Sequence, residues 1–387
     1  MYFYNKHKIS NEDIRHVVNS LKSNKITKGR YLKLFENKLK NYFNSKYSLA
    51  YSNGTIALFA VARCLEWKKN DIIILSPISF VAGANAISSV NANPLFVDVD
   101  EYFNLNPDKV EKKILELRKK KKKVKSIIIT DYGGNPANWK KFLHLKKKYK
   151  FSLINDNCHS LGSKINGNKS YAIKYADIVV QSYHAVKNIT SAEGGAILTN
   201  NKIFFEKLKI LREHGFEIDN LKDPWSYDLK TIGYNGRISE LNCALGYSQM
   251  SNLNKFVKQR NKIAKIYDKI FSKYDVLSIP NVKKGNFCSY HLYPLRFNWK
   301  KIGISKTKFY NIMKNKYGIN LQIHYKPTYK FKFYKSKINI RNSEFKNSEK
   351  FYNEVFSIPL YFGLTHKQIK FISGAIIKTI EQKFWGN

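Results

Sequence analysis

Lys187 stands at the end of a segment whose residue types could carry out chemistry on a carbonyl group. The segment from Asp177 to Lys187 reads DIVVQSYHAVK, an apolar stretch followed by Ser182, His184 and the lysine. Ligands of open α/β sheets bind beyond the carboxyl ends of the strands. A lysine held there, away from bulk water, would have a lowered pKa and could attack a carbonyl as a neutral amine. The alternative is that Lys187 is one more ordinary lysine in a lysine-rich chain. The neighbouring motifs decide between these two interpretations.

A second apolar stretch ends in a carboxylate and an imidazole. Residues 151–159 read FSLINDNCH, which places Asp156 and His159 directly after the predicted strand. A carboxylate at this position could keep a proton on the ring nitrogen of a heteroaromatic cofactor. Its alternative role is to cap the next helix.

A third segment predicts a phosphate-binding turn. Residues 52–55 read SNGT, and Gly54 and Thr55 would open a helix, where backbone N–H groups and the helix dipole attract anions. Phe80 opens another predicted helix, and its ring would either cover a flat cofactor or join the core. Together, these segments predict a site for pyridoxal 5'-phosphate (PLP), because each follows a strand of one predicted sheet. They would supply a phosphate-binding turn, an aromatic ring to stack on the cofactor, an acid for its ring nitrogen and an amine.

The elements that must position these side chains alternate along the first two hundred residues. Apolar spacing predicts helices at 11–23, 30–44, 55–66 and about 80–90. Short apolar runs predict strands at 48–51, 72–75, 95–99, 126–130 and 152–154, and around 178–182 and 195–199. This alternation predicts an α/β fold with a mainly parallel central sheet and helices on both faces.

The pattern changes after about residue 200. We predict helices at 200–214, 239–274, 305–317 and 366–385, with β-like stretches at 290–297 and 319–324. The chain of 387 residues is long enough for two domains. We therefore expect a large α/β domain with an N-terminal arm at 1–255 and a smaller α+β domain at 256–387.

The charge of the chain is extreme, at +41 with 69 Lys and Arg against 28 Asp and Glu. Clustered cations could bind nucleic acid, but the lysines are spread along the chain, which favours compositional drift. The run Arg118–Lys123 indicates a solvated connector. A basic surface would also help to collect an anionic substrate.

The cysteines and the apolar pattern indicate where in the cell the protein acts. The four cysteines are scattered without a CxxC pair, which argues against a disulfide framework or a metal site. We find no apolar run of membrane-spanning length and no signal-peptide pattern. The expectation is a cytoplasmic protein with no membrane or nucleic-acid partner.

The motifs SNGT, SPISFVAGAN, NDNCHSLGS, QSYHAVKNITSAEGGAILTN and GYNGRISELNCALG resemble, over nearly the whole chain, the DegT/DnrJ/EryC1/StrS family of PLP-dependent sugar aminotransferases. The resemblance implies a PLP-dependent transferase of fold type I and a homodimer with shared active sites. Its nearest likeness is to enzymes of pseudaminic-acid-type biosynthesis. These move an amino group from an amino acid, by analogy L-glutamate, to C4 of a UDP-linked 4-keto-6-deoxy-N-acetylhexosamine. The alternatives are perosamine-, legionaminate/bacillosamine- and 4-amino-arabinose-type sugars.

The resemblance also implies roles for individual residues. Lys187 would be the Schiff-base lysine and carry the proton. The cofactor would be bound by Gly54, Thr55, Phe80, Asp156, His159, Ser182 and, from the neighbouring subunit, Asn235. The nucleotide sugar would be bound by Tyr4, Asn24, Lys25, Ile26, Thr27, His184, His324, Tyr325, Lys326, Pro327 and Tyr334. For Asn235 the alternative is a purely local role in the turn with Gly233 and Gly236.

Two other functions fit parts of the sequence. Sugar dehydratases of the same family resemble this chain but carry histidine in place of the lysine, so Lys187 argues against that activity. A non-catalytic phosphate- or nucleic-acid-binding protein would suit the charge, but would not need the lysine, the carboxylate and the phosphate turn together.

Overall fold

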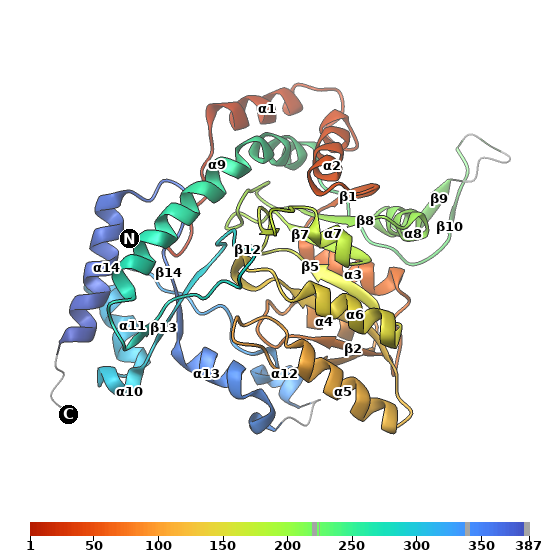
Figure 1. Cartoon of the computed structure of the whole chain (residues 1–387). Helices are drawn as coiled ribbons and strands as arrows, with labels where there is room; N and C mark the ends of the chain where they lie inside the picture. The colour runs from red at the N-terminus through yellow and green to blue at the C-terminus, as the bar shows by residue number, and fades with distance from the viewer. Residues whose placement is uncertain (219–222, 224, 337–340, 383–387) are drawn as a thin grey trace.

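The computed structural model of the protein describes residues 1–218, 223, 225–336 and 341–382. Its centre is a seven-stranded sheet with the order β1-β8-β7-β5-β4-β2-β3 (Figure 1). The strands are β1 (Tyr47–Tyr51), β2 (Ile72–Leu75), β3 (Asn93–Phe96), β4 (Val124–Thr130), β5 (Ser152–Asp156), β7 (Ile178–Ser182) and β8 (Gly195–Thr199). Only β8 runs against the others, since it pairs antiparallel with both β1 and β7. The predicted, mainly parallel sheet is confirmed.

Each face of the sheet has its own apolar core, which explains why its strands are continuously apolar. In β4, Ile127 and Ile129 belong to one core and Ile128 belongs to the other, because successive side chains of a strand point to opposite faces. The first core is covered by α2 (Arg30–Phe43), α5 (Pro107–Lys119), α6 (Trp139–Tyr149) and α7 (Tyr171–Tyr175). The second is covered by α3 (Gly54–Cys64), α4 (Ala82–Ser89) and α8 (Lys202–Arg212).

A long helix, α9 (Glu240–Phe271), leads from the large sheet to a smaller α+β region (Figure 1). Its residues up to Val257 join the core under the large sheet, and those from Ile263 onward join the C-terminal core. The predicted domain boundary at 255/256 thus falls inside this helix and stays a prediction. The helix also packs against α1 (Asn11–Leu21).

The C-terminal region is built on a three-stranded sheet with the order β11-β13-β14. Its elements are α10 (Trp299–Ile302), α11 (Lys306–Asn315), α12 (Lys332–Lys335), α13 (Lys346–Glu354), α14 (His366–Glu381), β11 (Leu277–Ser278), β13 (Tyr293–Phe297) and β14 (Val355–Ile358). The predicted helices at 305–317 and 366–385 are found, although residues 383–385 lie outside the described residues.

The predicted β-stretch at 319–324 is wrong. This segment makes only isolated bridges, Ile319 with Tyr2 and Gln322 with Ser357. The N-terminal arm lies against Ile319, the first residue of this segment. A local sequence pattern cannot predict a contact with an arm that is so distant in sequence.

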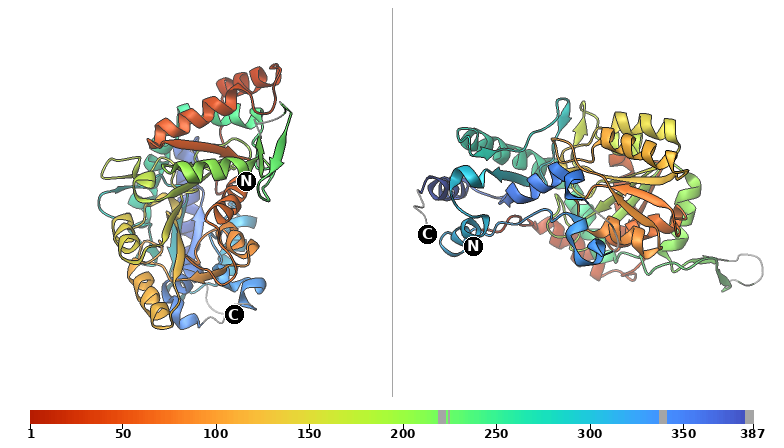
Figure 2. Two further views of the ribbon diagram at one scale, coloured as in Figure 1. Left: turned by 90° about the vertical axis from the view of Figure 1, so that its right-hand side faces the viewer. Right: turned by 90° about the horizontal axis from the view of Figure 1, so that it is seen from below.

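A hairpin of β9 (Phe216–Ile218) and β10 (Tyr227–Leu229) projects from the body of the molecule (Figure 2). The sequence pattern did not predict it. Phe216, Tyr227 and Leu229 are 43%, 63% and 55% exposed, so this ribbon presents apolar side chains to its surroundings. A further short pair joins β6 (Lys164–Ile165) to β12 (Asn286–Phe287). Among the described helices, none combines the length and the apolar character needed to cross a membrane.

Candidate active site

Lys187 lies just beyond the carboxyl end of β7, in a closed loop between β7 and β8. The Tyr183 N–H donates to the Gly194 carbonyl at 2.7 Å, and the Ser191 N–H donates to the Tyr183 carbonyl at 2.9 Å. These bonds fix both ends of the loop. Burial lowers the pKa of the Lys187 amine, and the nearby charges of Cys158 and Asp156 oppose this shift. The amine therefore loses its proton more readily than an ordinary lysine.

Asp156 ends β5, the strand beside β7, and pairs in register with Val180. It is 6% exposed. The Thr130 hydroxyl donates to it at 3.2 Å and the Cys158 N–H at 3.3 Å. Both bonds are long, so the carboxylate keeps capacity to accept a stronger hydrogen bond from a bound group.

The turn from β1 into α3 passes very close to the end of β7. A Cβ atom on Gly54 would lie 3.0 Å from the Ser182 Cβ and 3.5 Å from the Cys158 sulfur. Asn53 caps the helix by accepting from the Ile56 N–H at 2.9 Å. The first N–H groups of a helix have no partner within it, so Gly54 and Thr55 offer donors beside the Ser182 hydroxyl. A phosphate-sized anion fits this chemistry.

His159 is a buried neutral imidazole with both ring nitrogens engaged. Burial, followed by the charges of Lys187 and His324, lowers its pKa well below the ordinary value. The Gly133 N–H points to its Nδ1 at 3.4 Å, and its Nε2 lies 2.9 Å from the Tyr325 hydroxyl. With Nδ1 accepting, the ring proton sits on Nε2 and is donated to Tyr325.

The segment that contains Tyr325 covers the site from the small domain. The Thr328 N–H donates to the Pro77 carbonyl at 3.0 Å, and the rings of Phe80 and Tyr325 lie 6.1 Å apart. His324 bonds Ser357 through Nδ1 at 2.9 Å, and its ring lies 4.7 Å from that of Tyr4. Lys326 is exposed and Pro327 is buried. Phe80 itself is 57% exposed, so its ring is open to a flat ligand.

A second set of predicted residues gathers elsewhere, around the start of α9. Residues 24–27 are all exposed, and Thr27 bridges Ser239. The adjacent Lys28 pairs with Glu213 at 2.5 Å, and Glu213 bridges the exposed Asn235. Among the described residues, no hydrogen bond or ion pair joins this set to Lys187 or Asp156. The two groups are nevertheless neighbours, because the Ser52 N–H at the phosphate turn donates to the Gly236 carbonyl, one residue after Asn235, at 2.8 Å.

Two further predicted residues differ in their surroundings. His184 is exposed and lies 3.6 Å from Glu193, at the rim of the Lys187 loop. Tyr334 is only 2% exposed, its hydroxyl donates to Asn85 at 2.7 Å, and its ring lies 6.0 Å from that of Phe96. The structure thus places Tyr334 in the core, and its predicted contact with the nucleotide sugar stays a prediction.

The structure also reveals residues that the sequence pattern did not single out. Asn5, in the N-terminal arm, is 6% exposed and donates to the Val186 carbonyl at 2.5 Å, one residue before Lys187. Arg260 on α9 donates to the Asn5 side-chain oxygen at 3.0 Å and also to the Leu360 carbonyl at 2.8 Å. These contacts link the N-terminal arm, the helix between the domains and the lysine loop, and they join residues too far apart in sequence to form a motif.

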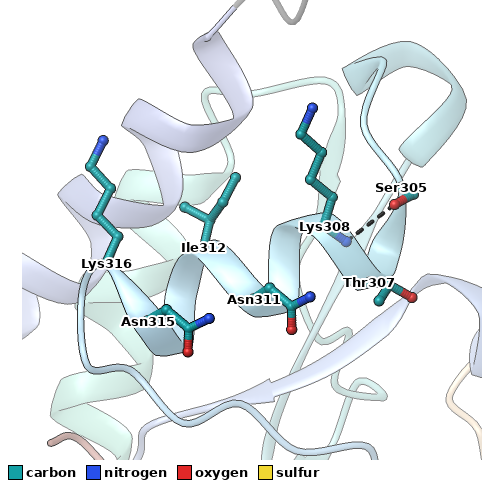
Figure 3. Close-up of a pocket in the computed structure, with 7 residues that line it drawn as sticks. All are labelled: Ser305, Thr307, Lys308, Asn311, Ile312, Asn315 and Lys316. Atoms are coloured by element: carbon teal, nitrogen blue, oxygen red, sulfur yellow. Dashed lines mark hydrogen bonds between the residues drawn. The ribbon is translucent and has the colours of Figure 1, made fainter. Parts of the chain in front are cut away.

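A surface hollow of about 500 Å³ lies elsewhere, along α11. Figure 3 shows its lining side chains pointing to different sides of the helix, with Ser305 accepting from the Lys308 N–H. None of the predicted site residues lines it. Since its polar groups do not converge on one point, the candidate site remains the carboxyl edge of the large sheet.

The fold and this edge define an α/β transferase with a half-buried lysine between a carboxylate and a phosphate-binding turn. The sequence model of the DegT/DnrJ/EryC1/StrS aminotransferase family matches residues 7–377. The chain belongs to this family and is an aminotransferase. Its central sheet, with helices around it, is that of the PLP-dependent fold type I.

Named relatives lie within this family. The chain is 32% identical over 382 residues to a UDP-4-amino-4,6-dideoxy-N-acetyl-beta-L-altrosamine transaminase of Campylobacter jejuni, covering 99% of this chain and 98% of the relative. It is also similar to the structure of PseC from Helicobacter pylori, an aminotransferase involved in pseudoaminic acid biosynthesis, with a TM-score of 0.90, 32% identity and coverage of 98% and 99% of the two chains. The PLP form of Spr1654 from Streptococcus pneumoniae matches with a TM-score of 0.86 and 25% identity, over 97% and 98% of the chains.

Proposed function

We propose that this aminotransferase uses PLP to move an amino group from an amino acid, such as L-glutamate, to C4 of a UDP-linked 4-keto-6-deoxy-N-acetylhexosamine. The observation that carries the proposal is the meeting of Lys187, Asp156 and the Gly54 turn at one edge of the sheet. The names of the relatives supply the sugar. Perosamine-, legionaminate/bacillosamine- and 4-amino-arabinose-type substrates are the alternatives.

The residues present fit the cofactor. The Gly54 turn and Ser182 would hold its phosphate, and Asp156, with its spare capacity to accept, would hold the proton on the ring nitrogen. Phe80 would cover one ring face from its exposed position. When bound, PLP supplies an electron sink that stabilises negative charge at the carbon losing its proton.

Lys187 has two tasks that its surroundings favour. Its amine would hold the cofactor by its aldehyde group, and would otherwise serve as the base that takes and returns a proton at the substrate carbon. A lysine with a lowered pKa is a better base near neutral pH than one in water. The neutral His159 does not compete for this proton, because burial disfavours its charged form.

The sugar would bind between the two domains. His324 and Tyr325 offer directional hydrogen bonds and Lys326 a positive charge for the diphosphate. Tyr4 closes this side from the N-terminal arm, where burial raises its pKa and keeps its hydroxyl protonated. This arrangement selects a ligand with both an anionic tail and a polar ring.

The direct test is a panel of nucleotide-linked keto-sugars incubated with glutamate and the holoenzyme. We expect the sugar to gain an amine in place of its ketone only with UDP-linked 4-keto-6-deoxy-N-acetylhexosamines. Mass spectrometry would detect this product as slightly heavier than the keto-sugar. Turnover of a GDP- or dTDP-linked sugar in preference would assign one of the alternative substrates. Loss of water from the sugar without gain of nitrogen would indicate a dehydratase.

We further propose that the active site is shared across a homodimer. Asn235 and residues 24–27 are exposed near the start of α9 and the base of the projecting hairpin, and no hydrogen bond among the described residues joins their side chains to Lys187 or Asp156. A partner that covers this region would receive these residues at its own cofactor and sugar. The apolar hairpin supports burial against a second chain.

Mixing two inactive variants tests the shared site. Lys187→Ala and Asn235→Asp chains, unfolded and reassembled together, should recover activity toward about a quarter of the wild-type value, because half of the random dimers would carry one intact site of two. Each variant reassembled alone is the control. If Asn235 acted within its own chain, no mixed dimer would hold an intact site and activity would stay absent.

Asn5→Ala tests how the N-terminal arm positions the lysine. The variant loses the bond to the Val186 carbonyl and frees the lysine loop, so we expect about a tenfold fall in kcat, close to the effect of one lost hydrogen bond. The pH midpoint of the cofactor's visible absorbance should shift as well. Lys6→Ala, an exposed neighbour in the arm, is the matched control. An unchanged absorbance titration with lowered thermal stability would assign Asn5 a purely structural role.

A further inference from the structure

The fold gathers basic residues that are separated in the sequence into one patch at the amino-terminal edge of the large sheet. Residues 107–150 contain sixteen Lys or Arg and four Asp or Glu, so this ninth of the chain carries twelve of its 41 net positive charges. They belong to α5, α6 and the segments that lead from these helices into β4 and β5. Figure 1 shows the two helices on the same side of the molecule.

Side-chain contacts show that the ends of the two helices lie together. Asp108 near the start of α5 pairs with Lys141 near the start of α6, and Arg118 at the end of α5 lies 5.6 Å from the ring of Tyr149 at the end of α6. The helices are therefore parallel, with adjacent carboxyl ends. Ten exposed basic residues crowd there: Arg118, Lys119, Lys120, Lys121, Lys122, Lys123, Lys125, Lys147, Lys148 and Lys150. We call these ten residues the basic edge.

Most of the basic edge lacks compensating acids. Within the described part of the chain, only Lys148 among the ten forms a salt bridge, with Glu111 at 2.9 Å. Elsewhere on the surface, lysines such as Lys301 and Lys330 pair with carboxylates at 2.8 and 2.6 Å. Repulsion among unpaired like charges disfavours such a cluster, and an anionic surface would relieve it.

The basic edge does not serve to collect the substrate. Asp156 and Lys187 follow the carboxyl ends of parallel strands, whereas the basic edge precedes the amino ends of β4 and β5. The seven residues of β4 separate the two edges by about 20 Å, which exceeds the Debye length of about 8 Å at physiological salt. Attraction at this edge therefore acts on a different partner.

We propose that the basic edge docks the enzyme on an anionic phospholipid membrane surface. Nine of its ten residues are lysines, which act as flexible point charges suited to mobile lipid headgroups, whereas nucleic-acid recognition favours the planar arginine fork. The one aromatic ring at this edge, Tyr149, is already engaged by Arg118 and by Glu111, to which its hydroxyl donates at 2.8 Å. It does not offer a free face for stacking on a base. This proposal departs from the expectation of no membrane partner, and gives the run Arg118–Lys123 a role beyond that of a solvated connector.

Vesicle co-sedimentation of the holoenzyme tests this proposal. Wild-type protein should pellet with vesicles of phosphatidylcholine and phosphatidylglycerol, and stay in solution with phosphatidylcholine alone. Each lysine near an anionic surface strengthens binding of the protein to the membrane about fivefold. A variant with Gln at Lys119, Lys120, Lys122, Lys123 and Lys125 should therefore bind on the order of 1000-fold more weakly. Lys121 is retained because its φ of 55° lies in the left-handed region.

The matched control removes the same charge from exposed lysines scattered over the rest of the surface: Lys22, Lys46, Lys265, Lys300 and Lys370. This control should bind vesicles nearly as the wild type does, and both variants should keep full transaminase activity. An equal loss of binding in both would show that net charge alone acts, and would overturn the proposal. It would also be overturned if wild type ignored the anionic vesicles, or if RNA in a gel-shift assay bound more tightly than they do and depended on the same five lysines.

Discussion

Lys187→Ala should lack measurable transamination while the protein stays folded. The substitution removes both the amine that binds the cofactor's aldehyde and the base that moves the proton. Acid–base catalysis alone contributes about 10²–10⁴-fold to a rate, so the loss should be at least that large. The measurement is the rate of product formation from glutamate and the keto-sugar, together with the borohydride-stable cofactor adduct found by peptide mapping.

The matched control is Lys174→Ala, an exposed lysine thirteen residues earlier in the chain. This control should keep wild-type activity and the adduct on Lys187. Mapping the reduced adduct to another lysine in the wild-type protein would disprove the assignment of Lys187, whatever the activity of the variant.

Asp156→Asn should bind the cofactor but lose most of its turnover. An amide cannot hold the positive charge of a protonated ring nitrogen, so negative charge at the reacting carbon would lose its stabilisation. A cost of about 4 kcal/mol in the barrier corresponds to about 10³-fold in rate. The measurement is kcat at saturating cofactor, with the visible absorbance recorded to show that PLP is bound.

Thr130→Val provides a graded comparison for Asp156. It removes the hydroxyl that donates to the carboxylate at 3.2 Å and leaves the carboxylate in place. Because this bond is long, we expect about a tenfold fall in rate or less. If Asp156→Asn were no slower than Thr130→Val, the carboxylate would serve the local turn, where it accepts from the Cys158 N–H at 3.3 Å, rather than the ring nitrogen.

Local pattern was sufficient for most of the large domain. Continuous apolar runs such as Ile72–Leu75 and Ser126–Thr130 predicted strands covered on both faces, and the structure confirms them because each strand separates two cores. The predicted helix start at Ser52–Thr55 is also found, since α3 begins at Gly54. The pattern failed at 319–324, where the first residue pairs with the N-terminal arm. It also failed at the hairpin of β9 and β10, where Phe216, Tyr227 and Leu229 are exposed rather than packed on a core.

Some residues of the candidate site could also be predicted from the sequence, and others could not. Lys187, Asp156 and Gly54 could be chosen because each follows a strand of one sheet, and parallel strands bring their carboxyl ends to a common edge. Asn5 could not be chosen, since its partners Val186 and Arg260 are 181 and 255 residues away. No short-range rule relates side chains at such separations.

By itself, the sequence determined the α/β class, the order of the main elements and the residues able to act on a carbonyl, because these depend on periodicity and on the chemistry of single side chains. The tertiary structure alone decided which of them meet. It placed Tyr334 in the core, gathered residues 24–27 and Asn235 near the start of α9, and joined the ends of α5 and α6 into one basic edge. These outcomes depend on packing between segments distant in sequence, where burial and crossing contacts, rather than local propensity, set the position of each side chain.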